Sequence, residues 1–372
     1  MHTARTVFLL QDLCTGGTQH QTLALAAGLD RARFAPELWT LSGPTELDVL
    51  AREGGLPVKH LGGQAFPGLD SCAALWRVLG RETPDIFFLC TALSNIWGRI
   101  AGRLRKLPLV LGSCRGGGAP VRQHERWLWR LAQHIVCNSP ALVEVMAGLG
   151  VPREHMSCIA NGVDTRRFQP GGLPFSRREP IILCVARLVE DKDHACLLDA
   201  FARLLGHMPE ARLRLVGEGP LEAELRVRMA RAPLEGKVEL LPATTDVAAC
   251  CRSAGVFALS SRQEGTPNVL LEAMASGLPA VATRVGGVPF LLREENGLTV
   301  PAGDADSLAQ GLLRVLRDPG LAQRMGEAGR ERAERDFSFS AMIAAHEELF
   351  ARFSGARRES AQAAGQDQER RA

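Results

Sequence analysis

The sequence lacks the features that mark several large classes of protein. None of its ten cysteines forms a C-x-x-C pair or stands at the spacing from histidine that a zinc site uses. Its net charge is only +3, which argues against a nucleic-acid partner. The cysteines are therefore expected to be reduced thiols, and Cys90, Cys137 and Cys184 lie in apolar runs where cysteine acts as a small hydrophobe.

Long hydrophobic runs are also absent. The N-terminal segment offers only the apolar run 7–10, which is far shorter than a signal-peptide core or the roughly 20 residues of a membrane span. We therefore expect a cytoplasmic protein. Any contact with the cytoplasmic face of a membrane would be peripheral.

Short apolar segments alternate with longer segments of helical periodicity, which is typical of repeated βαβ units with parallel sheets. The 372 residues, 46% of them hydrophobic, are enough for two domains. The predicted fold class is α/β, with two doubly wound Rossmann-like domains. Strands are expected at 6–10, 36–41, 58–61, 85–89, 109–113, 134–137 and 156–159, and then at 181–186, 212–216, 238–241, 255–259 and 279–283.

A segment rich in proline, glycine and arginine, 168–180, suits a linker between the two series of strands. The predicted domains are 1–167, completed by an amphipathic helix at 338–353, and 168–337. The polar remainder, 354–372, is expected to be a loose tail. Ligands of such sheets bind at the carboxyl ends of the strands, so the site is expected in the cleft between the domains.

The segment 264–287 is the most informative, and it reads EGTPNVLLEAMASGLPAVATRVGG. Thr266 is placed as a helix N-cap, Pro267 as the first helical residue and Gly277 as the helix stop. A helix that begins at the end of a strand points free N–H groups at a ligand, which favours a phosphate. Glu264 before the helix and Glu272 within it suit sugar hydroxyls on either side of that phosphate. The alternative is a helix with two solvated glutamates.

This segment resembles the glutamate-x7-glutamate motif of retaining glycosyltransferases of family four, which have the two-domain fold called GT-B. The resemblance extends from Val7 to about Phe350 and is strongest in the second half. It implies that Glu264 contacts the donor sugar and that Glu272 holds the ribose hydroxyls. The residues between them that match the motif, Gly265, Thr266, Pro267 and Asn268, are donor-binding candidates.

Arg187 and Lys192 follow the strand expected at 181–186. Cations there would stabilise a leaving diphosphate as it gains negative charge. The resemblance implies that this pair binds the diphosphate and that neither a metal nor another cofactor is required. The alternative is a surface arginine and lysine beside acidic neighbours.

Two further segments agree with the resemblance. Gly16 and Gly17 follow the first strand, as in the family's glycine-rich loop, and would let the backbone approach donor or acceptor closely. An ordinary loop is the alternative. The run Asn161-Gly162-Val163-Asp164 looks like the family's interdomain segment, and Asn161 is kept as an acceptor-side or first-domain candidate.

Arg115, in a run with three glycines, is the second acceptor-side or first-domain candidate. The surrounding block 99–130 is rich in arginine and also contains Trp97, Trp127 and Trp129, a composition that an interfacial membrane contact would use. A solvated face over a packed core is the alternative. Acceptors in the resembling family are often lipid-linked glycans, so the expected partners are a nucleotide-sugar donor and a glycan or polyprenyl-linked acceptor.

The sequence departs from the family at two positions. Many relatives have a histidine after a first-domain strand where this chain has Cys90-Thr91-Ala92, which leaves Thr91, Ser94, Asn95 and Arg115 as open substitutes. Relatives also have a glutamate where this chain has Phe290, so Glu294 or Glu295 would have to supply that contact from a shifted position.

The interpretation is a retaining glycosyltransferase that uses a nucleotide diphosphate sugar, with uridine diphosphate preferred from family frequency. A nicotinamide-dependent oxidoreductase is the main rival interpretation. It would need a G-x-G-x-x-G loop after the first strand, and the loop there lacks that glycine spacing. A nucleotide-sugar epimerase and a non-catalytic partner subunit that kept the fold both stay open as well.

Overall fold

The computed structural model describes residues 3–64, 67–116, 123–244 and 246–369. The chain divides into two compact units. Unit 1 contains Met1–Asn138, Leu142–Ala160 and Phe339–Ala372, and unit 2 contains Ser139–Ala141 and Asn161–Ser338. The chain thus enters unit 2 at Asn161, earlier than the segment that we expected to be a linker.

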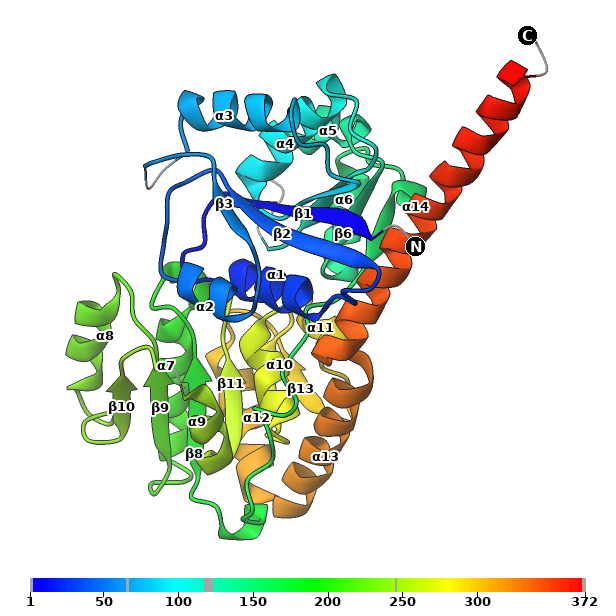
Figure 1. Cartoon of the computed structure of the whole chain (residues 1–372). Coiled ribbons are helices and arrows are strands. Elements are labelled where there is room, and N and C mark those ends of the chain that lie inside the picture. Colours follow the sequence, from blue (N-terminus) through cyan, green and yellow to red (C-terminus); the bar gives the residue numbers. More distant parts are fainter. Residues whose placement is uncertain (1–2, 65–66, 117–122, 245, 370–372) are drawn as a thin grey trace. The chain divides into compact units, whose positions relative to one another are not determined.

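The described part of unit 1 contains a seven-stranded parallel sheet in the order β3-β2-β1-β4-β5-β6-β7 (Figure 1). Its strands are β1 (Ala4–Leu10), β2 (Phe34–Thr40), β3 (Val58–His60), β4 (Ile86–Leu89), β5 (Val110–Cys114), β6 (His134–Cys137) and β7 (Met156–Cys158). The helices between them are α1 (Gly17–Gly28), α2 (Asp48–Glu53), α3 (Leu69–Leu79), α4 (Ala92–Leu104), α5 (Glu125–Leu128) and α6 (Pro140–Gly148).

The core strands of unit 1 are almost entirely apolar, as both faces of a parallel sheet are covered. One face packs Phe8 and Phe88 with α1 and with the C-terminal helix α14 (Phe339–Glu369), and Met342 and Phe350 of α14 are buried there. This confirms the amphipathic helix expected after Phe337. α14 continues through Glu369, where a loose tail was expected, because alanine, glutamine, glutamate and arginine favour helix. Residues 370–372 lie outside the described residues.

Unit 2 contains, in the part of the chain that the structure describes, a six-stranded parallel sheet in the order β10-β9-β8-β11-β12-β13. Its strands are β8 (Ile181–Val185), β9 (Arg212–Val216), β10 (Val238–Leu241), β11 (Val256–Leu259), β12 (Ala280–Thr283) and β13 (Gly297–Val300). Its helices are α7 (His194–Leu205), α8 (Glu222–Met229), α9 (Val247–Ser253), α10 (Asn268–Ala275), α11 (Val288–Leu291), α12 (Ala305–Arg317) and α13 (Pro319–Asp336). The fold class of two doubly wound sheets is confirmed, although the sequence did not predict β13.

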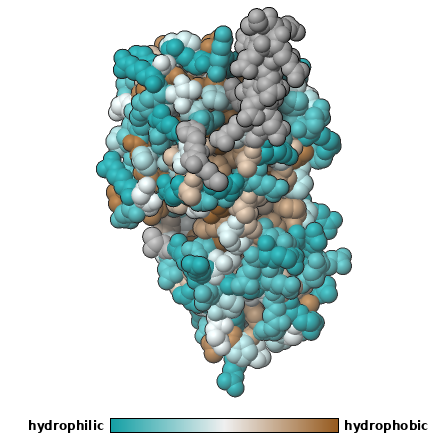
Figure 2. Space-filling model, turned by 45° about the vertical axis from the view of Figure 1, so that its right-hand side comes forward, coloured by the Kyte–Doolittle hydropathy of each residue, from teal (hydrophilic) through white to brown (hydrophobic). Residues whose placement is uncertain are grey.

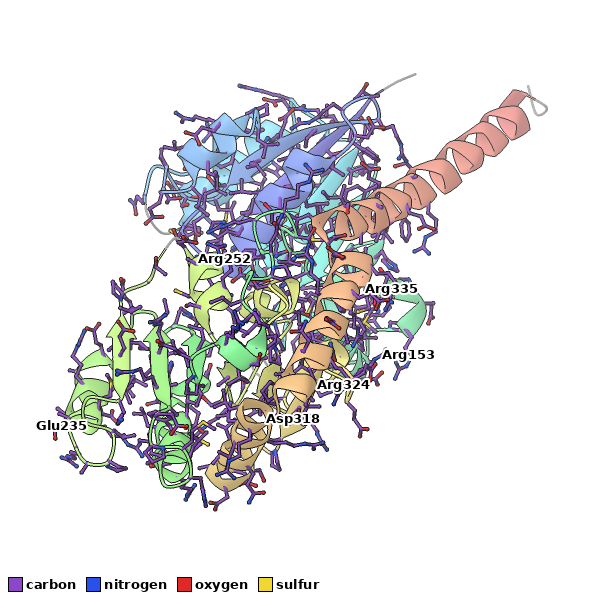
Figure 3. All side chains as sticks on the ribbon, turned by 90° about the horizontal axis from the view of Figure 1, so that it is seen from below. Arg153, Glu235, Arg252, Asp318, Arg324 and Arg335 are labelled. Carbon is purple, nitrogen blue, oxygen red and sulfur yellow. The ribbon has the colours of Figure 1, made fainter. Side chains whose placement is uncertain are left out.

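The long helix α13 has a polar outer surface. Asp318 caps its first turn by accepting a hydrogen bond from the amide of Leu321 over 2.8 Å, and Arg335 lies in its last turn, so charges at both ends complement the helix dipole (Figure 3). The face of unit 2 that carries α13 is mostly hydrophilic (Figure 2).

The expected linker is packed against unit 2. Arg330 of α13 donates from Nη1 to the carbonyl oxygens of Phe168 and Ala275, each over 2.5 Å, and from Nη2 to that of Thr165 over 3.1 Å. Phe168 is buried. Proline and glycine therefore mark an irregular segment here, but a buried aromatic ring and a bridging arginine hold it in place.

Candidate active site

Both sheets have the strand order in which the direction of winding reverses in the middle, and ligands of such sheets bind outside the carboxyl ends at that point. In unit 2 the reversal lies between β8 and β11, which pair directly, with Val256 beside Ile182 and Phe257 beside Leu183. The loop after β8 carries Arg187 and Lys192, and the loop after β11 carries Glu264. Three predicted site residues therefore lie on the two loops where a ligand is expected.

Lys192 and Glu264 are in direct contact. The Lys192 Nζ donates to Oε1 of Glu264 over 2.5 Å, and the hydroxyl of Ser261 donates to the same oxygen over 2.7 Å. The side chains of Lys192 and Glu264 are 18% and 8% exposed, so the pair is largely withdrawn from solvent. The sequence predicted both residues but not this ion pair or the role of Ser261.

The thiol beneath this pair is not a nucleophile. Cys184 of β8 is buried, and burial raises the pKa of its thiol to about 12, with the Lys192 and Glu264 charges acting in opposite directions. A thiolate is the reactive form of cysteine, and it is scarce at neutral pH when the pKa is this high. This agrees with the interpretation of Cys184 as a small hydrophobe.

Arg187 is exposed immediately beyond β8. Its guanidinium makes no hydrogen bond or ion pair with any described residue, whereas Lys192 and Arg262 nearby are each paired with a carboxylate. An exposed cation at the carboxyl end of a central strand is available to an anionic ligand. Its position agrees with the predicted contact to a diphosphate.

The helix after Glu264 begins one residue later than predicted. Pro267 is the N-cap of α10 and makes no side-chain cap, so the assignment of Thr266 as N-cap and of Pro267 as the first helical residue was wrong. The extended backbone of Pro267 (ψ 115°) moves the first turn to Asn268. The predicted stop is correct, because Gly277 has φ +62° and the amides of Gly277 and Leu278 bond back to Met274 and Ala273 in a Schellman motif.

Asn161 belongs to this loop rather than to the first domain. Its Nδ2 donates to the carbonyl oxygen of Thr266 over 3.1 Å and to Oδ1 of Asn268 over 2.7 Å. Asn161 is also buried. The structure thus places Asn161 in unit 2, where an amide able to donate twice ties a loop more than a hundred residues away in sequence, and its acceptor-side role stays a prediction.

Glu272 lies in the second turn of α10, and its carboxyl forms no hydrogen bond with the described residues. Burial raises the pKa of its carboxyl to about 7, although the nearby Arg167 charge acts to lower the pKa. A buried carboxylate without hydrogen bonds is unfavourable, so hydroxyl groups that donate to it would stabilise its ionised form strongly.

Two glycines bring the loop after β12 against the loop that carries Glu264. Gly286 has φ +51°, and a Cβ atom there would overlap the carbonyl oxygen of Glu264. The amide of Gly287 donates to the carbonyl oxygen of Gly265 over 2.8 Å. This close packing supports the Glu264 backbone from the side of β12.

In unit 1 most of the open first-domain candidates have structural roles. The hydroxyl of Ser94 accepts from the amide of Thr91 over 2.8 Å, and Asn95 Nδ2 donates to the carbonyl oxygens of Leu89 and Ser113. Gly16 is the N-cap of α1 with φ −169°, a conformation open to any residue, and Gly17 begins α1. These two glycines are thus not required by backbone strain.

Arg115 is the candidate that remains in unit 1. It follows β5, and burial lowers the pKa of its guanidinium. Its charge acts on the buried Cys90 thiol and on the buried His346 ring of α14, so these three groups lie near one another at the ends of β4 and β5. Gly117, Gly118 and Arg122, which belong to the same run, lie outside the described residues.

Phe290, which stands where the resembling family has a glutamate, packs against another aromatic ring. The ring of Phe290 meets that of Phe337 edge to face at 5.6 Å, and its carbonyl oxygen accepts from Arg332 Nη2 over 2.8 Å. Glu294 and Glu295 are exposed. The aromatic pair thus gives Phe290 a structural role of its own.

The described residues contain neither a metal-binding cluster nor a membrane-spanning helix. No three His, Cys, Asp or Glu side chains there are grouped as metal ligands. Among the helices of the described residues, none is long and apolar enough to cross a membrane.

Comparison with known proteins identifies the class. The family model of glycosyl transferases group 1 matches residues 165–332, and that of glycosyltransferase family 4 matches residues 15–167. The chain is 33% identical over 278 residues to the lipopolysaccharide core biosynthesis glycosyltransferase LpsE of Rhizobium meliloti (strain 1021), covering 73% of this chain and 77% of that protein.

One further relative and one solved structure name different nucleotide sugars in their descriptions. A GDP-mannose-dependent phosphatidylinositol monomannoside mannosyltransferase of Corynebacterium glutamicum is 32% identical over 206 residues, and the match covers 50% of this chain and 53% of that protein. The solved structure of Anabaena Alr3699/HepE in complex with UDP-glucose aligns with a TM-score of 0.81 at 20% identity, covering 94% of this chain and 99% of that one.

The chain is therefore a glycosyltransferase with the GT-B fold. It belongs to glycosyltransferase family 4. The resemblance found in the sequence is confirmed, and the rival interpretation as a nicotinamide-dependent oxidoreductase is wrong.

Proposed function

We propose that this protein transfers a sugar, with retention of anomeric configuration, from a uridine diphosphate sugar to a glycan or lipid-linked glycan. The observation that carries the proposal is the contact of Lys192 with Glu264 beside the exposed Arg187, at the winding reversal of unit 2. This arrangement offers two cations and the start of α10 to a diphosphate, and a carboxylate to the sugar next to it.

In the proposed reaction the acceptor hydroxyl attacks the anomeric carbon on the face from which the diphosphate leaves. The bond from the anomeric carbon to the phosphate oxygen breaks as the new glycosidic bond forms, and the acceptor proton passes to that phosphate oxygen. No protein nucleophile is needed. Arg187, Lys192 and the free amides at the start of α10 stabilise the charge that develops on the leaving group.

The two carboxylates take different parts in donor recognition. Lys192 and Ser261 both donate to Oε1 of Glu264 and so fix the orientation of its carboxylate. Oε2 can then accept a hydrogen bond from the donor sugar. Glu272 has no such contacts, and the ribose hydroxyls would be its donors. Because the cations come from the protein, we propose that transfer proceeds without a bound metal, so a chelator should leave the rate unchanged.

The proposed acceptor side lies on unit 1. Arg115, which follows β5, would attract an acceptor phosphate at the ends of β4 and β5. A lipid-linked acceptor also requires the enzyme to reach a membrane surface. The family relatives act on lipopolysaccharide core and on a phosphatidylinositol mannoside according to their names, which supports an acceptor of this kind.

A surface of unit 1 supports peripheral contact with an anionic membrane. α3, α4 and α5 lie side by side (Figure 1), and we call their exposed side the α3–α5 face. Arg105 stacks on the ring of Trp76 there, with its guanidinium carbon 3.7 Å from the ring centre. The face exposes the hydrophobic residues Leu69, Trp76, Trp97, Leu104 and Trp127 and the basic residues Arg77, Arg81, Arg103, Lys106, Arg126 and Arg130. Aromatic and basic side chains together are typical of proteins that bind the membrane interface.

The first test is thermal stabilisation by a panel of ligands: UDP, GDP, UDP-glucose, UDP-galactose, UDP-N-acetylglucosamine and GDP-mannose. A ligand that binds the folded state raises its apparent stability by mass action. The expected result is a shift with uridine nucleotides that Arg187→Ala and Glu272→Ala both weaken. Stabilisation by guanosine nucleotides alone would show that the donor base is guanine and not uracil. Stabilisation that is unchanged in both variants would reject the donor site.

A further inference from the structure

The loops that carry Lys192 and Glu264 are joined by more than the contact between those two side chains. The hydroxyl of Ser260 donates to the carbonyl oxygen of Lys192 over 2.8 Å. The amide of Arg262 donates to the carbonyl oxygen of Asp191, also over 2.8 Å. The backbone on both sides of Lys192 is therefore bound to the residues just before Glu264.

Asp193 has an unusual conformation immediately after Lys192. It is in the left-handed region, with φ +44° and ψ +49°, which costs a non-glycine residue about 1 kcal/mol or more. Its Oδ1 caps α7 by accepting from the amide of Cys196 over 3.3 Å. Its Oδ2 accepts from Nε of Arg262 over 2.9 Å, and its side chain is only 3% exposed.

The side chain of Arg262 is 65% exposed, so solvent screens its charge and weakens its attraction to the Asp193 carboxylate. It nevertheless binds the loop of Lys192 through both its backbone amide and its guanidinium. Both contacts reach residues next to Lys192. Stability alone therefore gives a weak reason for this arrangement.

Resting on the proposed function, we infer that Arg262 is a positioning residue for Lys192. By holding the carboxylate of Asp193, Arg262 fixes the left-handed turn that directs the Lys192 ammonium toward Glu264 and the leaving diphosphate. Arg262 itself does not contact the substrate. Small displacements of a group that stabilises a transition state reduce rates strongly, so loss of Arg262 should act mainly on kcat.

The test is a double-mutant cycle on the full chain, with nucleoside diphosphate release from the stabilising nucleotide sugar as the assay. Arg262→Ala is expected to lower kcat about tenfold with little change in KM, and Arg262→Lys to recover most of the loss, since lysine can still pair with Asp193. Once Lys192→Ala has removed the ammonium, Arg262→Ala should cause no further loss, because both substitutions remove one effect.

Arg203→Ala is the matched control. Arg203 lies on α7, its side chain is 48% exposed, and its ion pair with Asp306 over 3.1 Å joins α7 to α12 rather than to the loop of Lys192. It should keep full activity.

The outcomes separate the two ideas. An Arg262→Ala variant within twofold of the parent, or a loss of the same size with and without Lys192, overturns the positioning role alone. A fully active Lys192→Ala variant overturns the leaving-group role in the proposed function, and the positioning role with it.

Discussion

The amide of Gly287 donates a hydrogen bond to the carbonyl oxygen of Gly265 over 2.8 Å, which brings the loop after β12 against the loop after β11. The neighbouring Gly286 lies so close to the carbonyl of Glu264 that the space for a Cβ is already occupied. The position of one site carboxylate therefore depends on a residue more than 20 positions later that has no side chain.

Replacement of Gly286 by alanine should displace the Glu264 loop. The left-handed φ and the steric overlap act together, so the expected loss is about 3 kcal/mol in the free energy of unfolding, measured by urea denaturation. Gly303→Ala is the control, because Gly303 has φ +74° but open space around its Cβ position, and it should lose only about 1 kcal/mol. Equal losses in the two variants would show that the close packing has no energetic role.

Much of this fold could be predicted because its strands are short apolar runs. The runs around Ile182 and Phe257 have both faces covered, and such continuous runs stand out in the sequence. β13 was missed because Gly297–Val300 begins with glycine, includes a threonine and follows the polar stretch 293–296. A short edge strand carries too little hydrophobic signal to be distinguished from a loop.

The site could be predicted only where a motif is local. Glu264 and Glu272 share one segment, so the motif identified both. The contacts of Arg262 with Asp193 and of Asn161 with Thr266 join residues far apart in sequence, and no pattern in either segment indicates its partner. The N-cap was misplaced by one residue, because threonine is a common cap and the extended Pro267 could not be distinguished from a helical one.

Arg187 should be important for rate rather than for stability. Its guanidinium has no partner among the described residues, so Arg187→Ala should leave thermal stability nearly unchanged. The proposed contact with the leaving diphosphate predicts a loss in kcat of about 10²-fold to 10³-fold, measured by release of nucleoside diphosphate. Arg231→Ala, at another exposed arginine of unit 2, should keep full activity. A loss of only a few-fold for Arg187→Ala would reject the role.

Nucleotide affinity should depend on pH through Glu272. The free carboxyl has a pKa of about 7, and ribose hydroxyls bind the ionised form. Affinity should therefore be constant above pH 7 and fall by up to about tenfold per pH unit below it, measured by calorimetry. A phosphate group also titrates near pH 6, so Glu272→Gln is compared over the same range. That variant should bind more weakly and lose most of the dependence, and an unchanged profile would contradict the assignment.

The α3–α5 face should bind anionic lipid. Sedimentation with vesicles of phosphatidylglycerol is expected to carry the protein down, and vesicles of phosphatidylcholine are not, since the basic side chains need a negative surface. Trp127→Ser should weaken binding, because Trp127 is strongly exposed and its ring is free to enter the interface. Val227→Ser, at an exposed residue of α8 in unit 2, is the control and should bind as the parent does. Equal binding by both variants would contradict the assigned surface.

The carboxyl of Glu272 should also cost stability at neutral and higher pH. Its pKa is raised in the folded chain from 4.5 to about 7, so the folded state binds more protons than the unfolded state between these values, and stability must fall as pH rises through that window. Glu272→Gln cannot ionise and escapes the fall. The variant should be more stable than the parent at pH 8 by about 1–3 kcal/mol in urea denaturation, and the gain should shrink as the pH is lowered to 5.

Glu235→Gln, at the exposed residue labelled in Figure 3, is the control and should show no gain in stability at either pH. A parent as stable as the Gln variant at pH 8 would mean that the carboxylate already has partners that satisfy it. A hydrogen bond from a ribose hydroxyl to Glu272 would then add little to the free energy of nucleotide binding.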